Sequence, residues 1–324
     1  MSGKCGADWR PTATTTALRR RAALLAGSRE FFAERGVLEV ETPLLSAAGP
    51  SDPQIESLVT QVTGMCGRLF LGTSPEFHMK RLLAAGSGDI YQLCKAFRDA
   101  ERGRWHNPEF TLLEWYRTGF DDTAMMAEVE HLVARVLAPE RALPPAEHLT
   151  YGEALLRHAG IDAHAASERD LMDAAGARGI VCKAGLERDA LLDLLMGFVV
   201  GPRLGRDRPC FVRDYPASQA SLARLKPGLP PVAARFELYL DGIELANGFH
   251  ELANASEQRD RFARDLAIRR DRGQAQPPVD ERLLAALKWM PDCAGVAVGF
   301  DRVVAIALGT TQLAQAMAFS IDNA

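Results

Sequence analysis

Hydrophobic residues near helical spacing mark the first ordered segment of the chain. One helix face is formed by Leu18, Leu24, Leu25, Phe31 and Phe32. Gly36 follows, where a glycine that ends a helix is expected. Because residues 1–16 are polar, we expect a flexible tail over residues 1–17 and a folded domain over 18–324.

Short apolar runs after this helix predict strands and a long hairpin. Residues 37–40 and 68–71 have the character of strands, and HMKRLLAAG predicts a helix that ends at Gly86. DIYQLCKAF (89–97) and EFTLLEWY (109–116) predict two paired strands. The charged connection between them, RDAERGRWHNP, is too long for a tight turn and is typical of a functional loop.

The second half of the chain alternates between helical and strand patterns. Helical spacing over 121–138 and 150–200 predicts a helical insertion at about 121–200. In the run 234–242, Phe236, Leu238 and Leu240 alternate with polar residues, which predicts one strand of an antiparallel sheet. The following predictions are a helix capped by Asn254, a helix at 280–290, a strand at 295–300, and a last helix over 301–309 with Asp301 as its N-cap. This order favours an α+β fold with a mostly antiparallel sheet flanked by helices.

Composition narrows the class of protein. The 324 residues carry a net charge of −4, which does not indicate a general nucleic-acid surface. The six cysteines have no C-x-x-C spacing, so we expect reduced thiols and a cytoplasmic location. The sequence shows no membrane span and no signal peptide. It also lacks a P-loop and a G-x-G-x-x-G turn.

The candidate functional residues are therefore charged side chains that the strands of the sheet position. Phe110 and Glu114 share a strand face and lie roughly 13 Å apart along it, at about 3.3 Å per residue. This spacing suits an elongated ligand with a base at one end and an ammonium at the other. Taken singly, Phe110 is typical of a core residue and Glu114 of an exposed strand face. Their order together with Arg98 and Arg302 favours a site.

Three segments carry a family resemblance. FRDAERGRWHNPEFTLLEWY resembles motif 2 of class II aminoacyl-tRNA synthetases, and GVAVGFDRVVAIALG resembles their motif 3. LRRRAALLAGSREFFAERGVLEVETPLL resembles motif 1, whose helix and strand form the dimer interface in that family. HNPEFTLLEWY, TSPEFHMKRLL and GIELANGFHEL resemble lysyl-tRNA synthetases most closely.

The resemblance implies ATP and Mg²⁺ as cofactors and a role for individual residues. Arg98 would hold the α-phosphate, Arg302 would bind the γ-phosphate and cover the adenine, and Phe110 would stack beneath it. The further positions implied for ATP are Asp99, Ala100, Asn107, Leu245 and Gly299. Glu244 and Glu251 would both bind Mg²⁺. Glu244 would also contact ATP, and Glu251 would also contact the substrate. The positions implied for the amino acid are Ser74, Pro75, Glu76, Glu114 and Tyr116.

About seventeen residues precede motif 1, so we expect no anticodon-binding domain. In this the chain resembles the stand-alone lysyl-tRNA synthetase paralogues that attach lysine, preferably (R)-β-lysine, to a lysine of translation elongation factor P. The resemblance implies lysine or β-lysine as substrate, elongation factor P as partner, a homodimer, and no tRNA.

Departures from the family pattern leave alternatives open. Ala100 stands where motif 2 has a glutamate, and Glu101 is the neighbouring acid that would have to replace it. Ser74 and Ala297 stand where lysyl-tRNA synthetases have smaller residues, which would reshape the amino-acid pocket. A truncated synthetase that acylates tRNA or another carrier is one alternative, and a catalytically silent sensor that keeps the fold is another.

Overall fold

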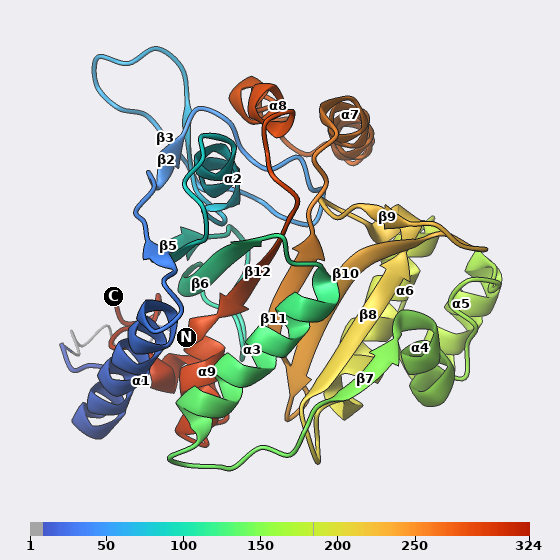
Figure 1. The fold of residues 1–324 in the computed structure, drawn as a ribbon. Coiled ribbons are helices and arrows are strands. Elements are labelled where there is room, and N and C mark those ends of the chain that lie inside the picture. Colours follow the sequence, from blue (N-terminus) through green and yellow to red (C-terminus); the bar gives the residue numbers. More distant parts are fainter. Residues whose placement is uncertain (1–8, 184) are drawn as a thin grey trace, which may run out of the picture.

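The computed structural model describes residues 9–183 and 185–324, and a large mixed sheet dominates them (Figure 1). Its strands are β1 (Leu38–Glu39), β5 (Ile90–Phe97), β6 (Glu109–Thr118), β7 (Glu147–Thr150), β8 (Cys210–Pro216), β9 (Leu225–Lys226), β10 (Val232–Leu240), β11 (Ile243–His250) and β12 (Cys293–Gly299). The strand order is β1-β5-β6-β12-β11-β10-β8-β7, and β9 pairs with β10. Only β1 with β5 and β7 with β8 pair in parallel within the described residues, so the predicted α+β fold is confirmed.

Helices and a small second sheet surround this sheet. The α-helices are α1 (Thr15–Ala33), α2 (Glu76–Ala84), α3 (Asp122–Leu137), α4 (Tyr151–Ala159), α5 (Glu168–Gly176), α6 (Arg188–Leu195), α7 (Ala255–Asp271), α8 (Glu281–Leu287) and α9 (Phe300–Ala307). Short helical turns are η1 (Met196–Val200), η2 (Gly201–Arg203), η3 (Ala217–Gln219) and η4 (Leu313–Ala316). The small antiparallel sheet has the order β2-β4-β3, with β2 (Leu45–Ser46), β3 (Val59–Thr60) and β4 (Leu69–Leu71).

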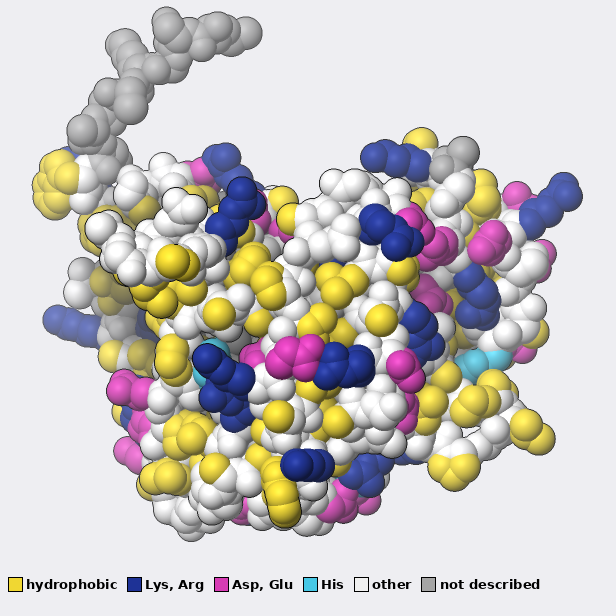
Figure 2. All heavy atoms as spheres, turned by 90° about the horizontal axis from the view of Figure 1, so that it is seen from above, with side chains coloured by type: hydrophobic (Ala, Val, Ile, Leu, Met, Phe, Trp, Pro, Cys, Tyr) yellow, Lys and Arg dark blue, Asp and Glu magenta, His cyan; other side chains and the backbone are white. Residues whose placement is uncertain are grey.

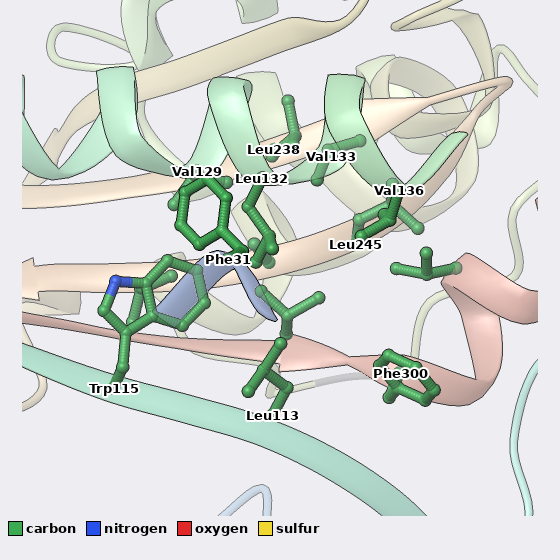
Figure 3. Packing of buried hydrophobic residues seen from close by; sticks show 14 of the residues in the cluster. Phe31, Leu113, Trp115, Val129, Leu132, Val133, Val136, Leu238, Leu245 and Phe300 are labelled. Atoms are coloured by element: carbon green, nitrogen blue, oxygen red, sulfur yellow. The ribbon is translucent and has the colours of Figure 1, made fainter. Parts of the chain in front are cut away.

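The main core lies between one face of the large sheet and helices α1, α3 and α9. Trp115 on β6 packs toward the α3 residues Val129 and Leu132, as Figure 3 shows. The Trp115 indole donates a hydrogen bond to the buried Glu128 carboxylate at 3.0 Å. Complete burial of a side chain such as Leu132 contributes about 1.5–3 kcal/mol, so this cluster fixes the three helices on the sheet. These three helices do not cover the opposite face of the sheet.

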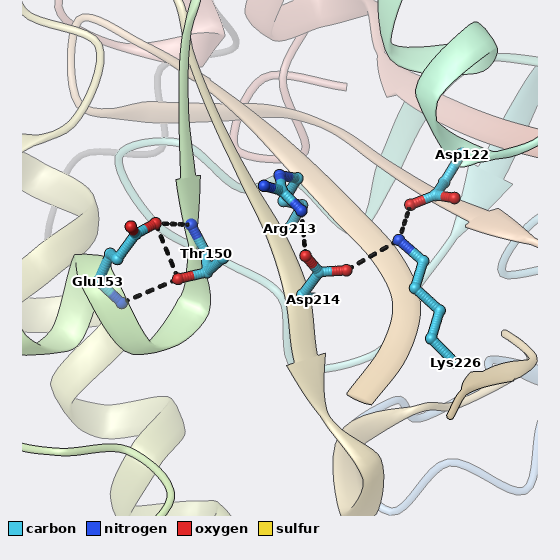
Figure 4. Close-up of polar contacts among 6 residues, drawn as sticks. All are labelled: Asp122, Thr150, Glu153, Arg213, Asp214 and Lys226. Atoms are coloured by element: carbon cyan, nitrogen blue, oxygen red, sulfur yellow. Dashed lines mark hydrogen bonds and ion pairs between the residues drawn. The ribbon is translucent and has the colours of Figure 1, made fainter. Parts of the chain in front are cut away.

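The helices within the predicted insertion at about 121–200 pack in two separate groups. Helix α3 belongs to the main core, whereas α4, α5 and α6 form a separate apolar cluster against β7 and β8. Lys226 joins the two regions, because its ammonium bonds both Asp122 at the start of α3 and Asp214 on β8 (Figure 4). Thr150 and Glu153 form a capping box that begins α4. The separate helical unit therefore starts near residue 150.

The N-terminal segment also differs from the prediction of a tail over residues 1–17. Residues 15–17 are helical, and Thr14 caps α1 by accepting from the Ala17 amide at 3.1 Å. The Thr12 amide donates to the Ala318 carbonyl at 2.8 Å, so this segment is held against the C-terminal residues. Residues 1–8 of the predicted tail lie outside the described residues.

Asp301 is not the N-cap that its position suggested. Gly299 occupies the cap of α9 without a side-chain bond, and Asp301 is a buried residue of the first helical turn. Its carboxylate accepts from the Thr111 amide at 2.7 Å and from Arg21 Nη1 at 2.6 Å. Arg21 Nη2 also donates to Thr111 Oγ1 at 2.8 Å. This partly buried ion pair, together with its hydrogen bonds to Thr111, thus connects α1, β6 and α9.

Candidate active site

A large pocket lies on the sheet face opposite the main core. Its empty space, including the open mouth, is about 1830 Å³. The floor comes from β6, β11 and β12, and the walls come from the loop at 43–55, the start of α2 and the loop between β5 and β6. In the view of Figure 2, basic and acidic side chains are scattered among hydrophobic and uncharged ones, with no broad stripe of one charge.

Alternation along two strands places the pocket residues. On β6, Phe110, Leu112, Glu114 and Tyr116 line the pocket, whereas Leu113 and Trp115 enter the main core. On β12, the small residues Gly295, Ala297 and Gly299 face the pocket between core valines. A Cβ atom at Gly295 would lie 2.3 Å from the Tyr116 ring and 2.4 Å from Glu251 Oε1, so glycine is required there.

A β-bulge places Glu244 on the same face. Leu238 pairs with Ala246 and Tyr239 pairs with Glu244, which leaves Leu245 as an extra residue on β11. The bulge changes the alternation, so that both Glu244 and Asn247 line the pocket. The Asn247 Oδ1 atom is buried and has no hydrogen-bond partner among the described residues. This end of β11 therefore offers oxygen atoms to a ligand.

The arginine end of the pocket is lined by Arg98 and Arg302. The Arg98 guanidinium lies 5.1 Å from the centre of the Phe110 ring, and its Nη1 lies 3.4 Å from Glu101 Oε1. Arg302 Nη1 donates to the Glu244 carbonyl at 2.7 Å, and Nη2 lies 2.9 Å from His106 Nε2. Two forked guanidinium groups beside an aromatic ring suit a ligand that carries phosphates and a planar base.

His106 can only accept from Arg302, because a guanidinium has no acceptor atom. Burial lowers the pKa of His106, and the neighbouring Arg302 lowers it further. A neutral imidazole is therefore the form that fits this contact. The contact links the loop between β5 and β6 to the first turn of α9.

The carboxylate end of the pocket holds three buried or half-buried glutamates. Lys80 Nζ lies 2.7 Å from Glu76 Oε1 and 2.6 Å from Glu251 Oε2. Tyr116 donates to Glu114 Oε1 at 2.8 Å, while Glu114 Oε2 is buried without a partner among the described residues. Three carboxyl groups thus stand against one ammonium, which leaves two of them able to pair with further cations. The arrangement suits a ligand with two ammonium groups.

Burial changes the pKa values of the charged groups at the carboxylate end. It raises the pKa of Glu114 to about 8, and the nearby Glu76 carboxylate adds to the rise. Burial likewise raises the pKa of Glu251 to about 7, although the Lys80 ammonium opposes this. For Lys80 itself, burial disfavours the charge, but Glu251 and Glu76 outweigh it and raise the pKa. Lys80 therefore stays charged in the folded protein.

The structure brings most of the predicted site residues into one pocket. Those that line it are Ser74, Glu76, Arg98, Asn107, Phe110, Glu114, Tyr116, Glu244, Leu245, Glu251, Gly299 and Arg302. Asn107 also has a structural contact, since its Oδ1 accepts from the Ile321 amide at 3.0 Å. Ala297, one of the two departures from the lysyl-tRNA synthetase pattern in this region, lines the pocket as well.

Pro75, Asp99 and Ala100 do not line the pocket, in contrast to the prediction. Pro75 precedes α2, and its carbonyl accepts from the His78 and Met79 amides. Ala100 adopts a left-handed conformation with φ 61°, and its exposed side chain lies outside the pocket, as does Asp99. Glu101 lines the pocket in their place.

The structure separates the two predicted metal ligands. Glu251 is paired with Lys80 at the carboxylate end, whereas Glu244 lies 3.9 Å from Arg302 at the arginine end. Burial raises the pKa of Glu244, and the negative charge of the Glu237 carboxylate raises it further. No group of three metal-binding side chains gathers within the described ranges. Glu244 and the free Asn247 Oδ1 are oxygen ligands of the kind that Mg²⁺ takes, so they fit an ion that keeps other ligands from water and phosphate.

Sequence reasoning missed Lys80, His106 and Asn247. Lys80 follows Glu76 by one helical turn, so the i, i+4 spacing in PEFHMK was the available signal. His106 lies within the charged loop that was expected to be functional. Asn247 gave no signal, because the bulge that turns it toward the pocket is a property of the β10–β11 pairing.

Comparison with known families agrees with this geometry. Residues 6–323 match the family model described as tRNA synthetases class II (D, K and N). None of the helices in residues 9–183 and 185–324 is long and apolar enough to cross a membrane.

Proposed function

The chain belongs to the class II tRNA synthetases (D, K and N), and on this premise we propose that it activates lysine or (R)-β-lysine and transfers it to elongation factor P. Class II synthetases activate an amino acid with ATP and Mg²⁺. The proposed acceptor is a lysine side chain of the factor, and the proposed location is the cytoplasm, where protein synthesis takes place.

The observation that carries the choice of amino acid is the carboxylate end of the pocket. Lys80 pairs with Glu76 and Glu251, and Glu114 lines the same end, so three carboxyl groups stand against one fixed ammonium and two remain for cations of a ligand. A diamino acid supplies two ammonium groups, and its carboxylate would then point toward the arginine end. Glu114 Oε2, buried and without a partner among the described residues, is the free acceptor for one ammonium.

The proposed first step joins the two ends of the pocket. The carboxylate oxygen of the amino acid attacks the α-phosphorus of ATP, and pyrophosphate leaves. Arg98 and Arg302 stabilise the negative charge on the phosphates, and Phe110 supports the adenine. Glu244 and Asn247 Oδ1 would hold Mg²⁺, which when bound neutralises phosphate charge.

In the proposed second step, the neutral amine of the acceptor lysine attacks the carbonyl carbon of the adenylate. The new amide bond replaces the bond to phosphate, AMP leaves, and the amine loses a proton. The three glutamates keep the aminoacyl group in place while the open mouth admits the acceptor chain. We assign no general base to this step.

We further propose a homodimer that uses the region of α1 and β1. Leu38 on β1 is 55% exposed, and Leu44 and Leu45 after it are exposed as well. A cluster of exposed leucines is typical of a surface that another chain covers. The mass of the protein in gel filtration tests this part of the proposal.

The first experiment measures ATP–pyrophosphate exchange with lysine, β-lysine and uncharged amino acids. Exchange that depends on lysine or β-lysine supports the proposal, and no exchange with any lysine analogue supports the silent sensor instead. The second experiment offers elongation factor P and bulk tRNA in parallel. A gain of one lysyl unit on tRNA alone would refute elongation factor P as the acceptor.

A further inference from the structure

Lys80 is a buried cation beside a pocket that we propose for a cationic substrate. Its side chain is 1% exposed, within the apolar surroundings of Met79 and Leu83 on α2. Burial of a charged ammonium is costly unless it is paired, and apolar packing alone would favour a methionine at this position. The charge therefore requires an explanation other than packing.

The contacts of Lys80 connect two different elements. Glu76 opens α2 one turn before Lys80, and Glu251 follows the end of β11. Lys80 is the only side-chain partner of either carboxylate among the described residues. Without the ammonium, neither carboxylate has another group that fixes its position.

Lys80 also lies behind the carboxylates. Glu76, Glu114 and Glu251 line the pocket, whereas Lys80 does not. A ligand would therefore contact the glutamates and not the ammonium. Lys80 acts on a ligand only through the acids that it holds.

From this geometry we infer that Lys80 is a positioning residue that fixes the separation of the Glu76 and Glu251 carboxylates and thereby selects between diamino acids. The inference rests on the proposed function. In lysine, the ammonium-bearing carbons C2 and C6 are four carbon–carbon bonds apart, and in β-lysine C3 and C6 are three bonds apart. Carboxylates held at one separation favour one of the two isomers, whereas mobile carboxylates accept both.

The test compares the variants K80M, K80Q and K80R with the wild type. K80M and K80Q remove the charge at similar length, and K80R keeps it. The KM values for lysine, β-lysine and ATP are measured by ATP–pyrophosphate exchange, and thermal melting reports folding. K95M is the matched control, because Lys95 is an exposed lysine of β5 whose Nζ lies 3.3 Å from Glu109.

We expect K80M and K80Q to raise the KM for the preferred isomer by about tenfold or more and to bring the ratio of the two isomers' kcat/KM close to one. The KM for ATP should change by less than about twofold, since the arginine end is untouched. K80R should retain more of the discrimination than K80Q, and K95M should resemble the wild type.

A folded K80M protein with unchanged discrimination would overturn the inference. Failure of all three Lys80 variants to fold would overturn it too, because Lys80 would then serve only the core. A wild type that uses both isomers equally would contradict the inference alone. A wild type that shows no exchange with either isomer would contradict the proposed function itself.

Discussion

Gly295 is the position where one added methyl group should separate amino-acid binding from nucleotide binding. Its Cβ atom would lie 2.3 Å from Tyr116 Cε1 and 2.4 Å from Glu251 Oε1, at least an ångström closer than ordinary contact at about 3.5 Å. Neither neighbour can move freely, since Tyr116 donates to Glu114 and Glu251 pairs with Lys80. G295A should therefore displace both side chains.

The expected cost follows from these contacts. Overpacking of a tight site costs about 1–3 kcal/mol of stability, and loss of the Tyr116 hydrogen bond contributes about 1 kcal/mol of that. Misplacement of two substrate acids by an ångström should raise the KM for lysine or β-lysine by about tenfold to a hundredfold. The KM for ATP should change little, because Arg98 and Arg302 are not displaced.

The assay is amino-acid-dependent ATP–pyrophosphate exchange, together with urea denaturation for the free energy of unfolding. G299A is the control on the same strand, since its Cβ atom would meet only the Arg302 side chain, at 3.4 Å from the nearest atom, Cδ. We expect G299A to keep the wild-type stability and KM for the amino acid. If G295A binds its amino acid as tightly as the wild type, the assignment of this end of the pocket is wrong.

Three further changes test other parts of the structure. R302A should raise the KM for ATP by about tenfold or more, because the contacts to His106 and Glu244 are lost as well as the charge; an unchanged KM for ATP in the exchange assay would argue against the arginine end as a nucleotide site. The Glu114 pKa of about 8 lies above that of an unfolded chain, so the stability cost of its ionisation develops as the pH rises from about 4 and is complete above about 8. E114Q should therefore gain on the order of 4 kcal/mol relative to the wild type between pH 5 and pH 8.5 in urea denaturation, and a constant difference would contradict this. G27A should stabilise α1 by about 0.5–1 kcal/mol, because nothing lies within 4 Å of the added Cβ atom; a lower melting temperature would show that another surface packs there.

The sequence predicted those elements whose pattern is local. The hairpin of β5 and β6 has alternation along both strands, so the strand pattern alone was sufficient to predict its face with Phe110 and Glu114. The apolar face of β10, with Phe236 and Leu238, was equally clear. In each case the period of two residues is a direct consequence of strand geometry.

Elements that depend on distant partners were missed or misjudged. β8 has Arg213 and Asp214 within it, and their charges hide the strand until Lys226 and the pairing with β10 are known. Asp301 has the sequence position of an N-cap, but Arg21, 280 residues earlier, gives its carboxylate a buried partner. No pattern within a short window contains that information.

The site residues likewise include some that a local pattern predicts and some that depend on the folded structure. Strand spacing was sufficient for Glu114 and Tyr116, but the presence of Glu244 on the pocket face depends on the bulge at Leu245. The left-handed conformation of Ala100 is likewise a property of the folded loop.

The ion pair of Arg21 and Asp301 bears on how these two positions vary among related sequences. Asp301 is paired with Arg21, and Arg302 lines the pocket from the same turn of α9. We therefore expect a substitution at Arg21 to displace Arg302, although Arg21 does not contact it. Loss of Arg21 leaves the buried Asp301 carboxylate without its cationic partner, which is destabilising. We therefore expect positions 21 and 301 to change together among related chains. Independent variation of the two would mean that the pair is dispensable.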